Sequence, residues 1–198
     1  MKLEGYGVRL RPVELADAAF IVWLRNLEHA KGMLGDTTMD VARQEEWLKA
    51  YFERDKDYYF LVETVGGISV GTHGLYNFQG ASAESGRFVI RPDVPAALPT
   101  SVLTFDLVFR QMGLTELRAS SVAGNRKLHS YIRKFGCRLV RTEPAGRIIN
   151  GQPVDILHFV QSAEDWFGVR DQFISLAEFA GHQIRDWERA QLEQRKAR

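Results

Sequence analysis

Three titratable side chains near the middle of the chain are of types that transfer protons in enzymes. Glu84 precedes a β-branched and aromatic run at 87–91, His73 lies in a glycine-flanked run at 68–78, and Tyr131 lies in a segment with helical spacing. A positioned carboxylate or imidazole can accept a proton, and a phenol can donate one. Each base also has a plainer interpretation: Glu84 as a solvated loop carboxylate, and His73 as a packed or solvated strand residue.

A second chemical feature is the loop from Pro92 to Pro99, which joins the run at 87–91 to a helix. The helix is indicated by apolar residues at steps of three and four and by a closing glycine, namely Val102, Phe105, Phe109, Met112 and Gly113. A loop that enters a helix N-terminus from a strand end is a ready site for phosphate, because free N–H groups and the helix dipole face the anion.

The segments around this loop have the order strand, helix, strand, helix. Residues 87–91 form the first strand, 117–122 are typical of a second strand, and 125–135 of a second helix. This order is typical of a crossover unit, whose two strands lie parallel. The sequence therefore predicts that 87–91 and 117–122 are parallel neighbours.

Hydrophobic periodicity indicates further elements on both sides of this unit. They are a strand at 7–12, helices at 14–33 and 41–52, a hairpin of 58–63 with 68–78, a hairpin of 137–142 with 154–160, and a helix at 168–198. Residues 79–83 are expected to form a polar loop. The turn of the second hairpin carries Asn150-Gly151, a strong hairpin signal.

This order of elements, with these residues, resembles the Gcn5-related N-acetyltransferase (GNAT) superfamily. The similarity is greatest to the RimJ/RimL-like ribosomal-protein N-acetyltransferases and their nucleotide-sugar relatives, and it covers residues 7–166. Four segments carry it: Glu84-Ser85-Gly86 before the strand, Ile90-Arg91-Pro92 at its end, Gly124-Asn125-Arg126-Lys127 opening the last helix, and Arg133-Lys134-Phe135-Gly136-Cys137 closing it.

The resemblance implies an α/β (α+β) fold with a central, mixed and mostly antiparallel sheet flanked by helices. Residues 1–166 would form the GNAT domain and 167–198 a helical extension. An apolar stripe is expected on the extension, at Phe173, Leu176, Ala180 and Ile184. That stripe would either pack on the domain or form the contact of a homodimer.

The resemblance also implies an activity, the transfer of an acetyl group from acetyl-CoA to a primary amine in a ternary complex. The amine would belong to an amino sugar on a nucleotide or to a peptide N-terminus. Glu84 corresponds to a glutamate of the branch and is the candidate base, with His73 as the alternative. The family's tyrosine acid falls at Ile132 here, so Tyr131, one position earlier, is expected to point elsewhere and is the weaker candidate.

The remaining site residues follow from the same resemblance. Trp23, Asn26 and Tyr76 would contact the acceptor, although plain core packing also accounts for Trp23 and for Trp47. Asn125 would bind the pantetheine arm or only cap its helix. The expected acetyl-CoA contacts are Phe88, Val89, Ile90, Arg91, Ala96, Ala97, Leu98, Thr100, Ser101, Asn125 and Lys127.

The phosphate loop departs from the family pattern Arg/Gln-x-x-Gly-x-Gly/Ala. Pro95, Leu98 and Thr100 stand at those places. Proline has no N–H, and side chains keep the backbone away from a pyrophosphate. We therefore expect weaker or differently placed CoA binding. The alternatives are a GNAT-fold protein that no longer transfers acetyl groups and serves as a binding or partner subunit, and an enzyme that uses another acyl donor.

The composition argues against several other classes of protein. A chain of 198 residues is long enough for one domain with a sizeable core. The net charge of +1 does not indicate a nucleic-acid-binding surface, and the single cysteine allows neither a disulfide framework nor a cysteine-based metal site. No apolar run is long enough to span a membrane, and no signal core begins the chain. We expect a cytoplasmic protein without a metal.

Overall fold

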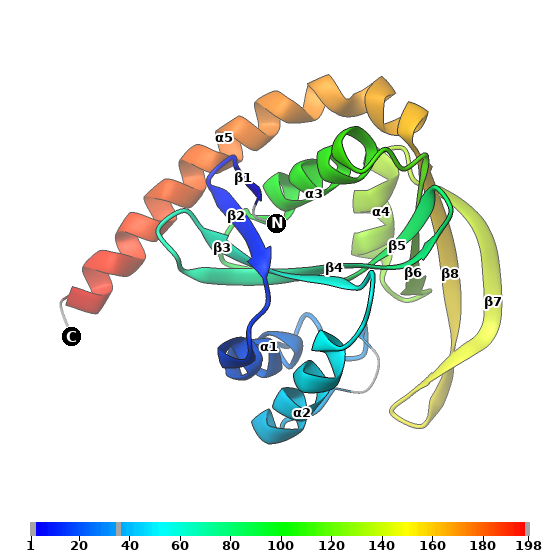
Figure 1. Ribbon diagram of the computed structural model, residues 1–198, viewed down its shortest axis with the longest axis horizontal. Coiled ribbons are helices and arrows are strands. Elements are labelled where there is room, and N and C mark those ends of the chain that lie inside the picture. Colours follow the sequence, from blue (N-terminus) through cyan, green and yellow to red (C-terminus); the bar gives the residue numbers. More distant parts are fainter. Residues whose placement is uncertain (1–2, 35–36, 197–198) are drawn as a thin grey trace.

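The computed structural model describes residues 3–34 and 37–196 and is built on one mixed sheet of eight strands (Figure 1). The strand order is β1-β2-β3-β4-β5-β6-β8-β7, and the β5–β6 pair is parallel while every other pair is antiparallel. The strands are β1 Leu3–Gly5, β2 Val8–Pro12, β3 Tyr58–Thr64, β4 Ser69–Gln79, β5 Ser82–Ile90, β6 Glu116–Val122, β7 Arg138–Ile149 and β8 Gln152–Ser162.

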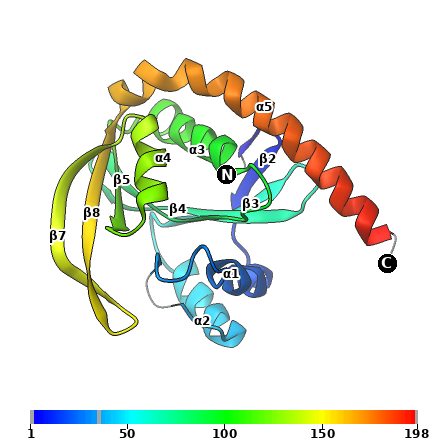
Figure 2. The same cartoon turned by 180° about the vertical axis from the view of Figure 1, so that it is seen from behind.

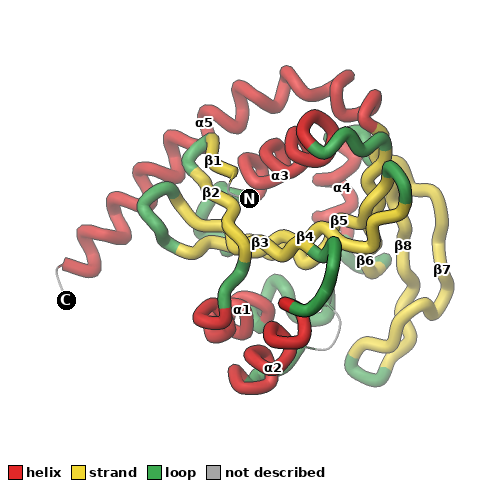
Figure 3. The backbone as a smooth tube through the Cα atoms, in the orientation of Figure 1, coloured by secondary structure: helices red, strands yellow, loops and turns green. Residues whose placement is uncertain are grey.

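Helices cover both faces of the sheet. In opposite views, α3 and α5 lie over one face, with α4 beside them, and α1 and α2 lie over the other (Figures 1 and 2). The helices are η1 Leu15–Asp17, α1 Ala18–Arg25, α2 Val41–Phe52, α3 Ala97–Asp106, its continuation η2 Leu107–Gln111, α4 Arg126–Lys134 and α5 Ala163–Lys196. The tube drawing shows the same three layers (Figure 3). In the two described stretches, no helix is both apolar and long enough to cross a membrane.

The main core lies between the sheet and the α3–α5 layer. Trp166, Phe173, Ala177 and Ile184 of α5 belong to one buried cluster with residues of β2, β3 and α3. Burial of one large apolar side chain stabilises a fold by about 1.5–3 kcal/mol, so this face of α5 contributes substantially. Leu176 is 52% exposed, so its predicted place in the buried stripe is wrong.

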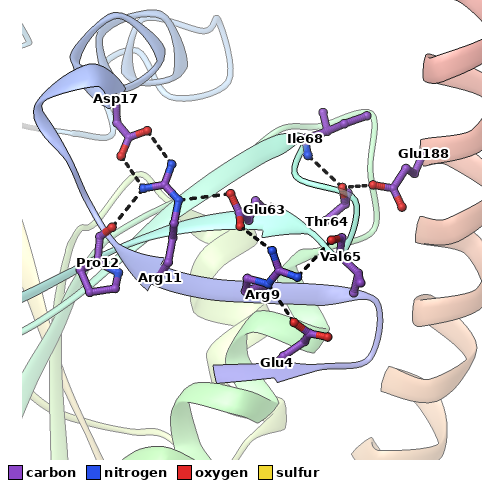
Figure 4. A network of polar contacts seen from close by, with 10 residues as sticks. All are labelled: Glu4, Arg9, Arg11, Pro12, Asp17, Glu63, Thr64, Val65, Ile68 and Glu188. Carbon is purple, nitrogen blue, oxygen red and sulfur yellow. Dashed lines mark hydrogen bonds and ion pairs between the residues drawn. The ribbon is translucent and has the colours of Figure 1, made fainter. Parts of the chain in front are cut away.

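Two glycines allow α5 to touch the N-terminal strands. A Cβ on Gly181 would lie 2.8 Å from the backbone of Tyr6, and a Cβ on Gly7 would lie 2.9 Å from the carbonyl oxygen of Gly181. Two turns further along α5, Glu188 accepts a hydrogen bond from the hydroxyl of Thr64 on β3 (Figure 4). The helix is therefore fastened to the end of the sheet formed by β1–β3.

An ion-pair network on β2 and β3 links the sheet to the helical layer on the opposite face. Glu63 accepts bonds from Arg9 at 3.1 Å and from Arg11 at 3.2 Å. Arg11 also donates two bonds of 2.8 Å to Asp17 of η1 (Figure 4). Asp17 and Glu63 are nearly buried, so each carboxylate needs these partners to offset its lost hydration.

Strands β5 and β6 pair over only part of their length. Ser82–Ser85 pairs in parallel with Glu116–Ala119, and beyond these four residue pairs the two strands separate. The two strands are parallel neighbours as predicted, but the prediction that residues 87–91 themselves pair with 117–122 is wrong, because residues 86–90 have no β6 partner. The edge of β5 that faces β6 is therefore free where β5 approaches α3.

A β-bulge lies on the other edge of β5. Thr72 pairs with Val89 and Gly74 with Gly86, so His73 of β4 lies opposite two residues of β5. One of these, Arg87, has a φ of 51°. A bulge of this kind bends the strand and re-aims its side chains, here beside the gap between β5 and β6.

Several boundaries differ from those expected. The strands of the last hairpin are longer than predicted, α5 begins at Ala163 and not at residue 168, and only residues 80 and 81 of the predicted loop at 79–83 lie outside strands. Two further differences bear on the site. The predicted strand at 87–91 begins at Ser82, so Glu84 lies inside β5 and not in a loop before it. The predicted helix at 14–33 is helical only to Arg25. Asn26 ends it, because its side-chain amide donates to the carbonyls of Val22 and Thr38 and so replaces the next helical turn.

We expect Asp106→Asn to lower the free energy of unfolding by about 2–3 kcal/mol near neutral pH, because it removes the carboxylate that fastens α3 to α5. Asp106 accepts bonds of 2.7 and 2.6 Å from Arg170 and one of 3.1 Å from Trp166. Urea unfolding measures the difference. Asp171→Asn is the matched control, because Asp171 is 97% exposed and lies 3.5 Å from the same arginine.

The effect of Asp106→Asn should depend on pH. Burial by itself raises the pKa of Asp106, but the bonds from Arg170 and Trp166 outweigh it and hold the pKa below the ordinary 3.8. A lowered folded-state pKa gives stability that is present above pH 3.8 and is lost as the pH falls through the folded-state value. The difference between the two proteins should therefore shrink below about pH 4; a difference that grows in acid would contradict this account.

Candidate active site

A cavity of about 270 Å³, here called the cleft, lies where β5 and β6 separate. It is bounded by β4 and β5, by the start of α4, by the chain after α1 and by β7. Its walls include Arg25, Met33, Leu34, His73, Tyr76, Glu84, Ser85, Arg87, Phe88, Ser120, Asn125, Tyr131 and Arg147. The structure thus brings together the three side chains predicted to transfer protons, together with Tyr76.

Glu84 and Tyr76 are directly opposite each other in the β4–β5 register. The Glu84 carboxylate is partly buried and accepts a 2.9 Å bond from the side-chain amide of Asn77, which holds its direction. Burial, with the negative charge of Glu84, raises the pKa of Tyr76 to about 12. Tyr76 therefore stays neutral at ordinary pH, and Glu84 is the carboxylate that can accept a proton in the cleft.

His73 is held inside the wall of the cleft. Its Nε2 lies 2.8 Å from the Ser85 hydroxyl and its Nδ1 lies 2.9 Å from the Thr104 hydroxyl. Burial lowers the pKa of His73 to about 4, so the ring is neutral. With both nitrogens bonded and the Phe88 ring 4.9 Å away, His73 is placed to support β4 and β5 and is a poorer base than Glu84.

A second cavity of about 830 Å³, here called the groove, lies on the α3–α4 side of the same gap. Its floor is the free edge of β5, and its rim carries the start of α4. The walls include His29, Lys31, Met33, Leu34, Phe88, Val89, Ile90, Pro92, Ala97, Gly124, Asn125, Arg126, Lys127 and Tyr131. The groove combines apolar walls with cations, and its one carboxylate among the described residues, that of Glu28, pairs with Lys31 at 3.0 Å.

The floor of the groove offers backbone hydrogen-bonding groups. The Arg91 N–H donates to Val70 of β4 at 2.8 Å, so by strand alternation the groups of Phe88 and Ile90 point to the free edge. His29 confirms this direction, because its Nε2 lies 3.1 Å from the Ile90 carbonyl oxygen. An extended ligand with amides could pair with this edge as an added strand does.

The cleft and the groove meet at α4. Phe88, Asn125 and Tyr131 line both cavities. The Tyr131 hydroxyl lies 2.9 Å from the Ser101 hydroxyl, and burial raises its pKa despite that bond. The expectation that Tyr131 points elsewhere is wrong, because its ring stands at the junction. The Asn125 side chain accepts from the Leu128 N–H, so it caps α4 as well as facing both cavities.

The start of α3 presents few donors to an anion. Ala97 and Leu98 have free first-turn N–H groups, while Pro99 has none. The Thr100 hydroxyl is fully buried and donates to the Ala96 carbonyl, and Ser101 bonds to Tyr131. Ala97 lines the groove, whereas Leu98 packs against the main core and Ala96 is buried in it.

Three other candidates lie away from both cavities. Trp23 is 45% exposed and faces Arg91, which also stacks on Trp187 and pairs with Asp93. Asn26 is used to end α1. The structure thus gives Trp23, Asn26 and Arg91 roles in packing and chain direction.

The sequence analysis missed several charged side chains at the site. Arg87 pairs with Asp57 and lies 4.5 Å from the centre of the Tyr76 ring, while Arg25, Arg126 and Arg147 line the cavities. An arginine between Gly86 and Phe88 in a strand was a usable signal for Arg87, and Arg126 adjoins Lys127. Within the described residues, no group of three or more histidine, cysteine, aspartate or glutamate side chains could hold a metal ion.

Comparisons with known proteins agree with this fold. Residues 8–138 match the family model described as an acetyltransferase (GNAT) domain. No curated protein matches the sequence significantly. Among solved structures, a GCN5-related N-acetyltransferase from Brucella melitensis is 20% identical with a TM-score of 0.78, over 89% of this chain and 85% of that one.

Two further structures have known acceptors in their descriptions. FdhC, described as a nucleotide-linked sugar GNAT, is 23% identical with a TM-score of 0.71, over 91% of this chain and 98% of that one. The spermidine/spermine N-acetyltransferase SpeG from Vibrio cholerae is 19% identical with a TM-score of 0.70, over 83% and 98%. At these identities, the likeness concerns the fold.

Proposed function

Because the chain belongs to the GNAT family of acetyltransferases, we propose that it transfers an acetyl group from acetyl-CoA to a primary amine. The observation that carries this proposal is the meeting of the groove and the cleft at Phe88 and Tyr131. A donor in the groove and an amine in the cleft would be in contact there, as direct transfer in a ternary complex requires. An amino sugar on a nucleotide is favoured over a peptide N-terminus.

The groove is the proposed site of acetyl-CoA, which supplies an acetyl group activated as a thioester. Phe88 and Ile90 offer the free backbone edge on which the amides of a pantetheine arm can pair. Arg126 and Lys127 open α4 at the mouth of the groove and have no carboxylate partner in the part of the chain that the structure describes. They are placed to bind phosphate, with the two N–H groups at the start of α3.

The residues of the cleft divide the proton transfers between them. Glu84 accepts the proton that the amine loses as its bond to the acetyl carbon forms. A β5 N–H at the free edge stabilises the negative charge that develops on the carbonyl oxygen. Tyr131, neutral because its pKa is raised, gives a proton to the sulfur when the carbon–sulfur bond breaks. Ser101 holds the Tyr131 hydroxyl in place.

The poor donor set at the start of α3 favours a second candidate function. A GNAT-fold protein that no longer transfers acetyl groups would have this fold with a loop that binds CoA weakly or not at all. Each lost hydrogen bond to a charged phosphate costs about 1.5–3 kcal/mol. We therefore expect an acetyl-CoA affinity below that of a relative whose loop glycines are intact.

Calorimetry with acetyl-CoA, followed by an assay of CoA release with a panel of amines, tests the proposal. We expect saturable binding, and about a fivefold to tenfold loss in Lys127→Ala, because one charge-assisted phosphate contact disappears. Lys134→Ala, at the other end of α4 and outside the groove, should bind as the wild type does. An absence of binding at about 1 mM acetyl-CoA would support the second candidate instead.

A further inference from the structure

A third cavity, of about 420 Å³, adjoins the cleft on the side of α1 and α2. Here it is called the arginine pocket, because Arg25 from the end of α1, Arg43 from α2 and Arg87 from β5 all line it. The other lining residues are Ile21, Thr38, Gln44, Trp47 and Tyr59. Arg25 and Arg87 also line the cleft, so the two cavities share a wall.

The three arginines differ in whether their guanidinium groups already have an ion-pair partner. Arg87 donates to both oxygens of Asp57, at 2.5 and 2.9 Å, and its guanidinium lies among the rings of Trp47, Tyr59 and Tyr76. Arg25 and Arg43 form no ion pair with any carboxylate in residues 3–34 and 37–196. No acidic residue from those stretches lines the pocket. It therefore carries uncompensated positive charge.

The polar groups of the pocket are those that bind an oxyanion. A guanidinium presents its N–H groups in a fork that matches two oxygens of a carboxylate or phosphate. The nearly buried Gln44 adds a side-chain amide. The Thr38 hydroxyl oxygen already accepts from the Asp40 N–H at 3.0 Å, which leaves its O–H free to donate.

The cleft beside the pocket has the complementary arrangement. Glu84 is the one carboxylate that lines it among the described residues, and it is the group that would receive an amine. Arg25 and Arg87 line both the cleft and the arginine pocket, and Arg147 of β7 adds a further positive charge to the cleft. An acceptor with its amine at Glu84 would reach the arginine pocket with a negatively charged end, whereas a second positive charge there would be repelled.

We propose that the acceptor is an amine that also carries an oxyanion, either a carboxylate or a phosphate ester, and that Arg25 and Arg43 bind that oxyanion. This inference rests on the proposed function and specifies its substrate class. It separates this chain from a polyamine acetyltransferase, since a polyamine would place a cation in the arginine pocket. The phosphates of a nucleotide sugar and the carboxylate of an amino acid share the required chemistry.

Binding of amine-free anions tests the pocket without relying on acetyl transfer. Calorimetry would use UDP, inorganic pyrophosphate and glutarate, each with the wild type, Arg25→Gln, Arg43→Gln, Lys127→Ala and Lys49→Gln. We expect at least one probe to bind saturably, with a loss of about tenfold or more in each arginine variant. Lys49→Gln removes the same charge from an exposed position on α2 and should change nothing. Thermal melting would confirm that every variant is folded.

The probes also show which anion is bound and where. Stronger binding of UDP and pyrophosphate than of glutarate would indicate a phosphate ester, and the reverse order a carboxylate. Binding that is lost in Lys127→Ala but kept in Arg25→Gln and Arg43→Gln would place the anion in the groove and overturn the proposal. No saturable binding of any probe up to about 10 mM would overturn it as well.

Measurements of turnover are the second part of the test. Glucosamine 6-phosphate, glucosamine and spermidine would be compared as acceptors, with aspartate as the carboxylate-bearing amine. An anionic acceptor should have the lowest KM, and Arg43→Gln should raise that KM about tenfold while leaving the KM of glucosamine unchanged. Preference for spermidine would overturn the proposal. If no amine is acetylated but the anions still bind through Arg25 and Arg43, the proposed function fails and the oxyanion site stands.

Discussion

Glu84→Gln is expected to lower kcat by about a hundredfold or more, because general-base catalysis contributes about 10²–10⁴ to a rate. The Glu84 carboxylate lies in the cleft, where Asn77 donates a hydrogen bond to it, and Glu84 does not line the groove. The affinity for acetyl-CoA should therefore stay within about twofold of the wild type. Turnover against pH, together with calorimetry on the same preparations, measures both quantities.

Glu116→Gln is the matched control for this variant. Glu116 begins β6, is only partly buried and lines neither cavity, so its loss of charge should leave kcat unchanged. An undiminished rate for Glu84→Gln at neutral pH would remove Glu84 as the base. The remaining titratable nitrogen in the cleft is that of His73, and His73→Asn would then be the next variant, despite the two hydroxyls that hold its ring.

Removal of residues 171–198 is expected to lower the melting temperature by about 10–20 °C. The segment carries Phe173, Ala177, Ala180 and Ile184, which are at most 8% exposed. The two larger side chains alone contribute about 3–6 kcal/mol, and about 1 kcal/mol shifts the melting temperature of a chain this size by roughly 2–4 °C. Calorimetric melting and solution mass measure the effect.

A shorter truncation tests whether the loss of stability comes from this buried packing or only from shortening the helix. Removal of residues 189–198 deletes only the end of α5, where the described side chains are exposed or nearly so, and should leave melting unchanged within a few degrees. If the longer truncation cannot be purified, Phe173→Ala removes one ring from the same core and should cost about 3–5 kcal/mol. Unchanged melting after the long truncation would mean that α5 does not close the core.

The order of elements in the middle of the chain could be predicted because local pattern and packing agree there. The apolar residues of α3 repeat at helical steps, and the strands on either side of α3 are limited to parallel pairing by the crossover. The start of β5 was missed because Ser82, Ala83 and Glu84 have low strand propensity. Pairing with β4 and β6 on both edges overrides that propensity.

The site was only partly predictable, for a geometric reason. Glu84 and Asn125 match family motifs, and Tyr76 shares a predicted strand with His73. The register of β4 and β5 and the start of α4 place all three at the cleft. Trp23 and Asn26 were predicted from a family segment that faces the acceptor, but Trp23 lies against Arg91 and Asn26 ends α1. The helix that was predicted to reach residue 33 ends at Arg25. Met33 and Leu34 therefore leave the helix and line both cavities.

The arginine pocket could not be predicted in the same way. Its guanidinium groups come from α1, α2 and β5, which are far apart in the sequence, and no local spacing relates them. Arg147 reaches the same region from a hairpin whose register shifts between Glu143 and Arg147. Only the folded arrangement shows that these charges line two adjoining cavities, the arginine pocket and the cleft.

The contact between α5 and strands β1–β3 also bears on how the chain folds during synthesis. Gly181 packs on the Tyr6–Gly7 turn and Ile184 lies in the same core as Val8 and Leu10, so β2 completes its core with residues that are synthesised much later. At about 5–20 residues per second, translation leaves the apolar side of β2 and β3 uncovered for several seconds or longer. During that interval, chaperone contact or pairing with other nascent chains competes with folding, and the arrival of residues 173–184 ends the competition.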